Sequence, residues 1–197
     1  MKTTTSALVL LATGFEEIEA ITTIDVLRRA NMDVTAAGLT PGPLIAARKT
    51  AHMPDVLLDD VLDRAFDIVI LPGGNDGTAN LKADPRVKEL LLKQKTAGRW
   101  IAAICAAPTI LVAHGLLTPT QRIICHPGAQ SNVPAERLLT SARVVIDGKL
   151  ITSLAAGSSM EFAYAIVNAL LGPDALRSVD GGVLAPYALD AALAVEV

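Results

Sequence analysis

The chain has 197 residues, of which 51% are hydrophobic and 3% aromatic, and its formal net charge is -3. This length suits one ordinary domain with a core of small aliphatic side chains, and the composition excludes a disordered chain. The negative charge and the lack of a basic run argue against a direct nucleic-acid partner. No apolar stretch approaches the roughly 18 residues that a membrane span requires. Two cysteines are too few for a disulfide framework, so we expect a cytoplasmic protein.

The first eighty residues alternate short apolar runs with segments of helical periodicity. The predicted elements are strands over 6–12, 33–38 and 66–71, helices over 16–30 and 59–64, and two short extended pieces within 44–53. The apolar start is short and runs into Glu16 and Glu17, so we interpret it as a first strand rather than as a signal peptide. PGGNDGTAN at 72–80 is rich in turn residues and is predicted to be a loop.

A capped helix over 85–98 is predicted after this loop. Asp84 stands at its N-cap, Pro85 at its first position and Gly98 at its end. The other predicted elements are strands over 100–104 and 122–125, a hairpin of strands 143–146 and 150–153 joined by Asp147 and Gly148, and helices over 108–117 and 158–171.

The C-terminal residues are the least clearly patterned part of the chain. Residues 174–197 show two candidate helical turns interrupted by SVDGGVLAP. We therefore predict a domain over 1–172 and a C-terminal extension over 173–197 to which the sequence assigns no role.

The residues around Cys105 predict a strand that turns directly into a helix. An apolar run at 100–104 precedes Cys105, and apolar residues at helical spacing follow it. Such a turn lifts a side chain off the end of a strand, as the serine turn of the α/β-hydrolases does. Helix amides pointing at the thiol are expected to lower its pKa. The alternative is an inert core residue, because free cysteine is among the most buried residue types.

The order of the predicted elements helps to decide between these alternatives. Strands alternating with helices indicate an α/β fold with a mostly parallel sheet covered on both faces, and such sheets bind ligands beyond the carboxyl ends of their strands. The loops that follow the predicted strands therefore share one edge. The chemically active residues in those loops are Glu16, Glu17, Glu19, Gly73, Gly74, Cys105 and His126. This gathering favours a functional Cys105.

Five motifs resemble the ThiJ/PfpI superfamily, and most closely its parkinsonism-associated deglycase branch with small bacterial homologues. They are GFEEIEA at 14–20, LPGGNDGTANL at 71–81, AAICAAP at 102–108, HP at 126–127 and SSMEFA at 158–163. The resemblance runs in order from about residue 6 to residue 172. It implies a flavodoxin-like three-layer α/β sandwich, a homodimer, and an oxidisable cysteine on a strained turn.

The resemblance also implies roles for individual residues. Cys105 matches the nucleophile, Glu19 the carboxyl group that hydrogen-bonds the thiolate, and His126 a nearby imidazole. Gly74 and Ala106 match the residues whose backbone N–H groups bind an oxyanion. Arg48 matches an arginine that is a candidate for binding an anion.

The sequence departs from the family pattern at two places. Cys105 is followed by Ala106, where the protease-like branch has histidine, so the proteolytic triad of that branch is missing. AAGS at 155–158 stands where close relatives have GPGT, and Leu154 replaces an arginine found in some of them. These changes put in doubt an anionic site built on that arginine.

Several candidate residues also have simpler interpretations. Glu16 and Glu17 suit the start of a helix, and Glu19 could be an ordinary solvated helix residue. His126 could simply bond a backbone carbonyl, and Cys125 is expected to be a buried strand residue rather than a resolving thiol. Scattered histidines and the absence of a phosphate-binding loop predict neither a metal nor a nucleotide cofactor.

Two classes of function stay open from the sequence. The first is a cofactor-independent enzyme that uses Cys105 on reactive carbonyls, such as methylglyoxal or its adducts, to give hydroxy acids. The second is a redox-responsive stress protein or chaperone in which Cys105 is oxidised without turnover.

Overall fold

The short apolar runs form the strands of one mostly parallel sheet in the computed structural model, which describes residues 4–194. The strands, in their order across the sheet, are β5 (Val56–Leu57), β2 (Asp33–Gly38), β1 (Ser6–Leu11), β6 (Ile68–Leu71), β7 (Trp100–Ile104), β9 (Leu150–Ser153) and β8 (Val144–Asp147). All neighbours are parallel except β8 and β9, which form an antiparallel hairpin. A separate antiparallel arm consists of β3 (Leu44–Ile45) and β4 (Ala51–His52).

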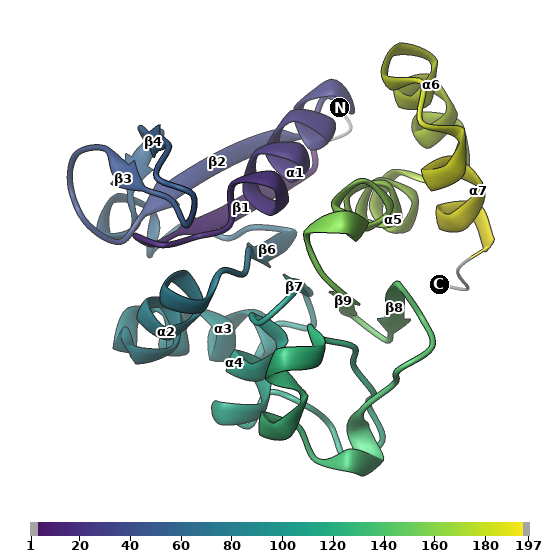
Figure 1. Ribbon diagram of the computed structural model, residues 1–197. Coiled ribbons are helices and arrows are strands. Elements are labelled where there is room, and N and C mark those ends of the chain that lie inside the picture. The colour runs from purple at the N-terminus through teal and green to yellow at the C-terminus, as the bar shows by residue number, and fades with distance from the viewer. Residues whose placement is uncertain (1–3, 195–197) are drawn as a thin grey trace.

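Helices cover both faces of this sheet, as Figure 1 shows. One face carries α1 (Glu17–Arg29), α5 (Ser159–Leu171), α6 (Pro173–Val183) and α7 (Pro186–Ala194), and the other carries α2 (Asn75–Ala83), α3 (Pro85–Thr96) and α4 (Pro108–Ala113). Short 3-10 helices are η1 (Leu58–Val61), η2 (Pro127–Asn132), η3 (Ala135–Arg137) and η4 (Ala156–Ser158). The predicted three-layer α/β class is therefore confirmed.

The protein has two hydrophobic cores, one on each face of the sheet, because the side chains of the central strands alternate between the faces. Successive side chains of a strand point to opposite faces. On β1, Val9 packs in the core beneath α1 and α5, whereas Leu8 and Leu10 pack in the core on the side of α3 and α4. Because both faces are buried, the strand is apolar throughout, as is typical of parallel sheets.

Most predicted elements are present with shifts of a few residues at their ends. The cap of α3 is confirmed, because the Asp84 carboxylate accepts a hydrogen bond of 2.9 Å from Arg86 N. Gly148 has φ +63° at the turn between β8 and β9, which suits the predicted Asp-Gly hairpin. None of the helices within residues 4–194 is both long and apolar enough to cross a bilayer.

Three sequence predictions were wrong in part. The segment predicted as a loop at 72–80 contains the start of α2, because small polar residues that favour turns also favour helix starts. Helix α4 ends at Ala113, four residues before the predicted end. Residues 122–125 do not form a strand, since Ile123 makes one isolated bridge with Leu138 and Ile124 N donates to Thr152 Oγ1.

The weakly patterned C-terminal segment forms two helices that pack against α5. Leu176 on α6 and Ala188 on α7 are fully buried in the same core as α5. The Tyr164 hydroxyl donates to Asp180 Oδ1 at 2.9 Å, and Ala185 N donates to the same oxygen at 2.9 Å. Residues 173–194 thus complete the cover of one face of the sheet, beside α5 in Figure 1.

Leu176→Ala should lower the free energy of unfolding by about 2–5 kcal/mol, because it removes a buried side chain and leaves a cavity beneath α6. Urea unfolding followed by circular dichroism measures this difference. Leu92→Ala is the matched control, since Leu92 is 39% exposed on α3, and it should change stability by less than about 0.5 kcal/mol. Equal effects of the two variants would contradict the packing of α6 described above.

Candidate functional site

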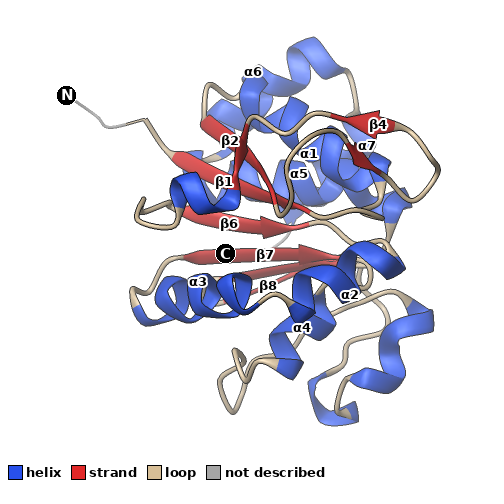
Figure 2. Ribbon diagram, turned by 90° about the vertical axis from the view of Figure 1, so that its left-hand side faces the viewer, coloured by secondary structure: helices blue, strands red, loops and turns tan. Residues whose placement is uncertain are grey.

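Cys105 lies on the turn between β7 and α4, as predicted, and its backbone is in the left-handed region with φ +65°. A non-glycine residue rarely adopts this conformation, so neighbouring groups must hold it there. Cys105 N donates to Ser153 O at 3.0 Å, and Cys105 O accepts from His126 N at 2.8 Å. The turn is therefore fixed on both sides, and the half-buried thiol projects from the carboxyl end of β7. Figure 2 shows β6 and β7 ending at this common edge.

Glu19 meets Cys105 from the first turn of α1. The Glu19 side chain is fully buried, and its Oε2 accepts a hydrogen bond of 2.7 Å from Gly73 N. A Cβ atom added to Gly73 would lie 2.7 Å from both Cys105 Cβ and Glu19 Oε2, so only glycine lets the two side chains come together here. The second carboxyl oxygen, Oε1, is buried without a hydrogen-bond partner among residues 4–194.

Burial dominates the acidity of Glu19. It raises the pKa of this carboxyl group to about 7, although the Cys105 thiol and the Gly73 N–H lower the pKa and nearby Glu16 adds a small increase. A buried carboxylate is disfavoured because water no longer solvates its charge. Glu19 can therefore hold or release a proton near neutral pH, unlike a solvated glutamate.

The pKa of Cys105 departs from the sequence prediction. Burial, followed by the negative charge of the neighbouring Glu19, raises the pKa of the thiol to about 12, while Gly74 N–H and Ala106 N–H lower it. The expectation of a thiol acidified by the turn alone was thus wrong, because it considered the amides without the burial and the carboxylate. Cys105 and Glu19 are close enough to titrate together. The first proton lost therefore belongs to the pair rather than to either residue alone.

Two backbone N–H groups point to the thiol, and they belong to the residues that the sequence predicted for oxyanion binding, Gly74 and Ala106. Gly74 has φ +88°, and a Cβ atom there would lie 2.3 Å from Gly14 O. Only glycine can occupy this position without displacing backbone, so the direction of the Gly74 amide is fixed. The arrangement provides two donors for negative charge that develops beside Sγ.

A pocket of about 320 Å³ opens in front of Cys105. Its lining residues are Gly14, Glu16, Ala47, Arg48, Gly74, Asn75, Asp76, Cys105 and His126. The structure thus brings the predicted His126 and Arg48 to the same pocket as Cys105. Asn75 and Asp76 were missed, because they begin the unpredicted helix α2.

His126 and Arg48 are both exposed at this pocket. His126 Nδ1 accepts a hydrogen bond of 3.0 Å from Gly128 N, which assigns the proton of the neutral ring to Nε2. Arg48 N donates to Glu17 Oε1 at 2.7 Å, so Glu17 braces the β3–β4 arm rather than Cys105. Glu16 Oε2 accepts from Glu19 N at 2.9 Å and so caps α1, as expected of a carboxylate at a helix start.

Cys125 is fully buried, and burial raises the pKa of its thiol to about 11. The expectation of a buried residue is confirmed, although Cys125 is not on a strand. Within residues 4–194, no three His, Cys, Asp or Glu side chains are grouped closely enough to hold a metal ion.

Iodoacetamide at neutral pH should modify Cys105 at least about tenfold faster than Cys125, because only the first thiol is accessible from a pocket. Peptide mass spectrometry over a time course gives both rates. The expected end point is one modified cysteine per chain while the protein stays folded. Faster labelling of Cys125 would contradict the burial described above.

Comparisons with known proteins give matches over most of the chain. The model of the DJ-1/PfpI family matches residues 5–169. The chain is 42% identical over 177 residues to a Parkinson disease protein 7 homolog from Danio rerio, covering 88% of this chain and 93% of the relative. It is 40% identical over 176 residues to glutathione-independent glyoxalase DJR-1.2 from Caenorhabditis elegans, with coverage of 88% and 93%.

Solved structures also match the chain over most of its length. The crystal structure of Drosophila melanogaster DJ-1beta superposes with a TM-score of 0.89 at 39% identity, covering 92% of this chain and 98% of that one. Oxidized DJ-1 from Toxoplasma gondii superposes with a TM-score of 0.88 at 30% identity, with coverage of 91% and 98%.

Proposed function

Because the chain belongs to the DJ-1/PfpI family, we propose that it is a cofactor-independent cysteine enzyme that converts reactive carbonyls to hydroxy acids. The substrates would be small aldehydes such as methylglyoxal, or the adducts that they form on other molecules. The observation that carries this proposal is the contact of Cys105 with the buried Glu19 at an open pocket. The activity named for the C. elegans relative supports the same class of reaction.

The first step would be addition of Cys105 Sγ to the aldehyde carbon. Above the pKa of Glu19, about 7, the Glu19 carboxylate can accept the thiol proton as the sulfur attacks. The new C–S bond gives a hemithioacetal, and the N–H groups of Gly74 and Ala106 hold the oxygen that gains negative charge. Because the pKa of Cys105 is raised, transfer of the thiol proton to Glu19 is needed to make the sulfur nucleophilic.

The second step would move hydrogen within the adduct. A base removes the proton from the former aldehyde carbon, and a proton is returned to the neighbouring carbonyl carbon, so the first carbon is oxidised and the second reduced. Glu19 beside Cys105, or His126 at the pocket, would carry this proton. The product is a hydroxy-acid thioester of Cys105. Water then hydrolyses it to lactate and the free thiol, and no external oxidant or reductant is consumed.

A redox role without turnover is the alternative, and the orphaned Glu19 Oε1 favours it specifically. Peroxide would oxidise Cys105 to a sulfinate, and a protonated Glu19 could donate from Oε1 to a sulfinate oxygen. The same half-buried thiol would then serve as a sensor of oxidative stress.

The purified protein, incubated with methylglyoxal and without glutathione, tests the enzymatic proposal. Lactate formed in many equivalents per chain supports it. Lactate that never exceeds one equivalent, together with a stable mass increase of two oxygen atoms after peroxide, would support the redox alternative instead.

A homodimer is the expected assembly, and an apolar surface near the site supports this prediction. Ile18 and Ile21 on α1 are 56% and 40% exposed, and Ile45 and Met53 on or beside the β3–β4 arm are 41% and 71% exposed. The arm is joined to the start of α1, since Gly14 N donates to Ile45 O at 2.8 Å. Four exposed large side chains in connected segments are typical of an interface.

Light scattering should therefore give about twice the chain mass of 20.5 kDa. Ile21→Glu should shift the protein toward the monomer, because it places a charge in the apolar interface. Leu92→Glu on α3 is the control and should keep the dimer. A wild-type protein that stays monomeric at high micromolar concentration would contradict the prediction.

A further inference from the structure

A second and larger cavity, of about 400 Å³, lies at the opposite edge of the sheet from Cys105. Gly98 and Arg99, which precede β7, and Gly148 and Lys149, which precede β9, form part of its wall. Cys105 follows β7. At roughly 3.3 Å per residue, the length of this strand separates the two sites by about 15 Å or more. The cavity is thus independent of the pocket in front of Cys105.

The floor of this cavity is apolar. Four side chains form it, none more than 6% exposed: Ile101, Leu111, Leu116 and Leu150. They come from β7, α4, the residues after α4, and β9. Because these elements belong to the packed core, the floor is already formed without a ligand. Its size falls within the range of small-molecule sites.

The rim of the cavity is cationic. Lys95 and Arg99 line it together with a single acidic residue, Asp147. Asp147 Oδ2 already accepts a hydrogen bond of 2.9 Å from Arg122 N. Positive charge therefore predominates at the mouth of an apolar cavity.

The cations of the rim are only weakly engaged by the protein. The guanidinium group of Arg99 makes no hydrogen bond or ion pair within residues 4–194, although the residue is only half exposed. Lys95 Nζ donates to Gly115 O at 3.2 Å. Lys149 also lines the cavity, but its Nζ lies 4.2 Å from the centre of the Trp100 ring, which packs in the core on the other face of the sheet, so its charge is directed away from the floor. A planar guanidinium without a partner is suited to a carboxylate, which it binds through two parallel hydrogen bonds.

We infer that this cavity is a binding site for a small organic acid with an apolar body, such as an arylalkyl carboxylate. The apolar body would lie on the floor formed by Ile101, Leu111, Leu116 and Leu150, and the carboxylate would meet Arg99 at the rim, with Lys95 nearby. An inorganic anion would leave the apolar floor exposed to water, and a neutral apolar molecule would leave the cations without a partner. The apolar floor and the cationic rim together therefore favour an organic acid with an apolar body.

Titration with 3-phenylpropionate, followed by ¹H–¹⁵N correlation spectra, tests this inference. Amide shifts should saturate and should centre on Gly98, Arg99, Gly148 and Lys149. A fragment of this size should bind with a Kd of about 1 mM or below. Acetate, which lacks the apolar body, and 3-phenylpropanol, which lacks the charge, should each bind at least about tenfold more weakly.

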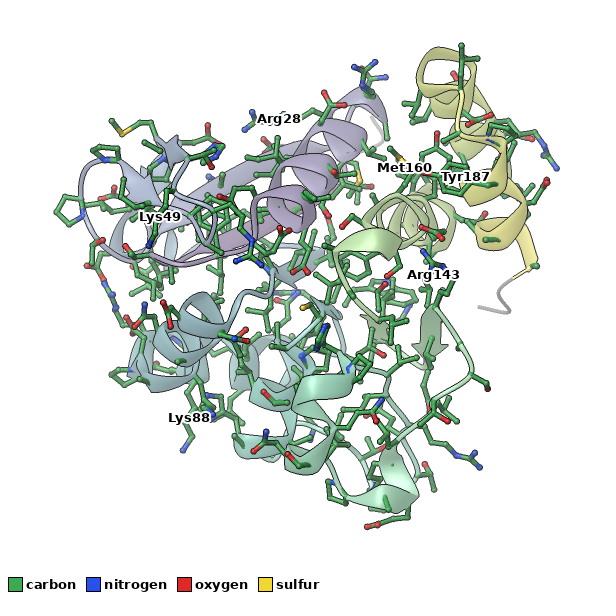
Figure 3. All side chains as sticks on the ribbon, viewed as in Figure 1. Arg28, Lys49, Lys88, Arg143, Met160 and Tyr187 are labelled. Carbon is green, nitrogen blue, oxygen red and sulfur yellow. The ribbon has the colours of Figure 1, made fainter. Side chains whose placement is uncertain are left out.

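Arg99→Gln should weaken binding of 3-phenylpropionate at least about fivefold and leave binding of 3-phenylpropanol unchanged, because the substitution removes only the charge. Lys88→Gln is the control, since Lys88 is an exposed cation of α3 outside the cavity (Figure 3). Well-dispersed spectra show that each variant is folded. Shifts centred elsewhere, equal affinity for the acid and the alcohol, or an Arg99→Gln variant that binds as the wild type does would each overturn the inference.

Discussion

Cys105→Ser should reduce lactate formation from methylglyoxal by at least about a thousandfold, because it removes the nucleophile. A serine hydroxyl ionises at much higher pH than a thiol, and the buried Glu19 with a pKa of about 7 is too weak a base to compensate. Serine is nearly isosteric with cysteine, so the strained turn at φ +65° should persist. The expected loss therefore reports on chemistry rather than on folding.

Cys125→Ala is the matched control for this experiment. Cys125 is fully buried away from the pocket, so its replacement should lower stability by about 1 kcal/mol and leave the rate within about twofold. Thermal unfolding of both variants separates the two effects. A Cys105→Ser protein that keeps a tenth or more of the wild-type rate would show that Cys105 is not the nucleophile.

The position of the site was predictable because it follows from local patterns and topology. A short apolar run followed by helical spacing placed Cys105 on a turn, and parallel strands bring the loops after them to one edge. The roles of Gly74 and Ala106 came instead from the resemblance of their motifs to the ThiJ/PfpI superfamily. The placement of Cys105 depends on sequence neighbours and on the order of the strands, which the amino-acid pattern records directly.

The burial of Glu19 could not be derived from the residues around it. On α1 it has polar and apolar neighbours, and its burial depends on Gly73, which lies 54 residues away in the chain. The same long-range contact explains the wrong prediction for the pKa of Cys105. The sequence shows the amides of the turn, but the desolvation of both acidic groups is a property of the packed structure.

Helices α6 and α7 illustrate a second limit of sequence patterns. Their buried residues are Leu176 and Val179 on α6 and the two small residues Ala188 and Ala192 on α7. Gly181 and Gly182 lie within α6 and disfavour a helix, and alanines mark the buried face of α7 only weakly, so this segment is hard to recognise from the sequence. Its stability comes from packing on α5 and from the bonds of Asp180 with Tyr164 and Ala185. Tertiary contacts rather than local propensity therefore determine this segment.

Glu19→Gln should remove the ionisation near pH 7 from the pH profile of kcat/KM. In the wild type, the Cys105–Glu19 pair loses its first proton near the pKa of Glu19, about 7, so the rate should rise with pH through this value. With glutamine, Cys105 must ionise alone from a buried position. The inflection should then move above the ordinary thiol pKa of about 8.5, and the rate at pH 7 should fall roughly thirtyfold or more.

The same substitution should increase stability above neutral pH, and this readout does not depend on activity. The pKa of Glu19 is raised on folding from 4.5 to about 7. A raised carboxyl pKa means that the folded state binds the proton more tightly, so wild-type stability falls as pH rises through this window. Glutamine accepts the Gly73 hydrogen bond without a charge. Glu19→Gln should therefore match the wild type near pH 4 and exceed it by about 1–3 kcal/mol at pH 8.

His126→Asn distinguishes Glu19 from His126, the other residue proposed to carry the proton. If Glu19 governs the ionisation, the His126 variant keeps the inflection near the pKa of Glu19, about 7, whatever its rate. A pH profile that is unchanged in Glu19→Gln, together with a loss of activity in His126→Asn, would transfer the role of base to His126. The stability difference at pH 8 concerns only the buried carboxylate. If this difference is observed together with that kinetic result, Glu19 is buried as described but takes no part in the reaction.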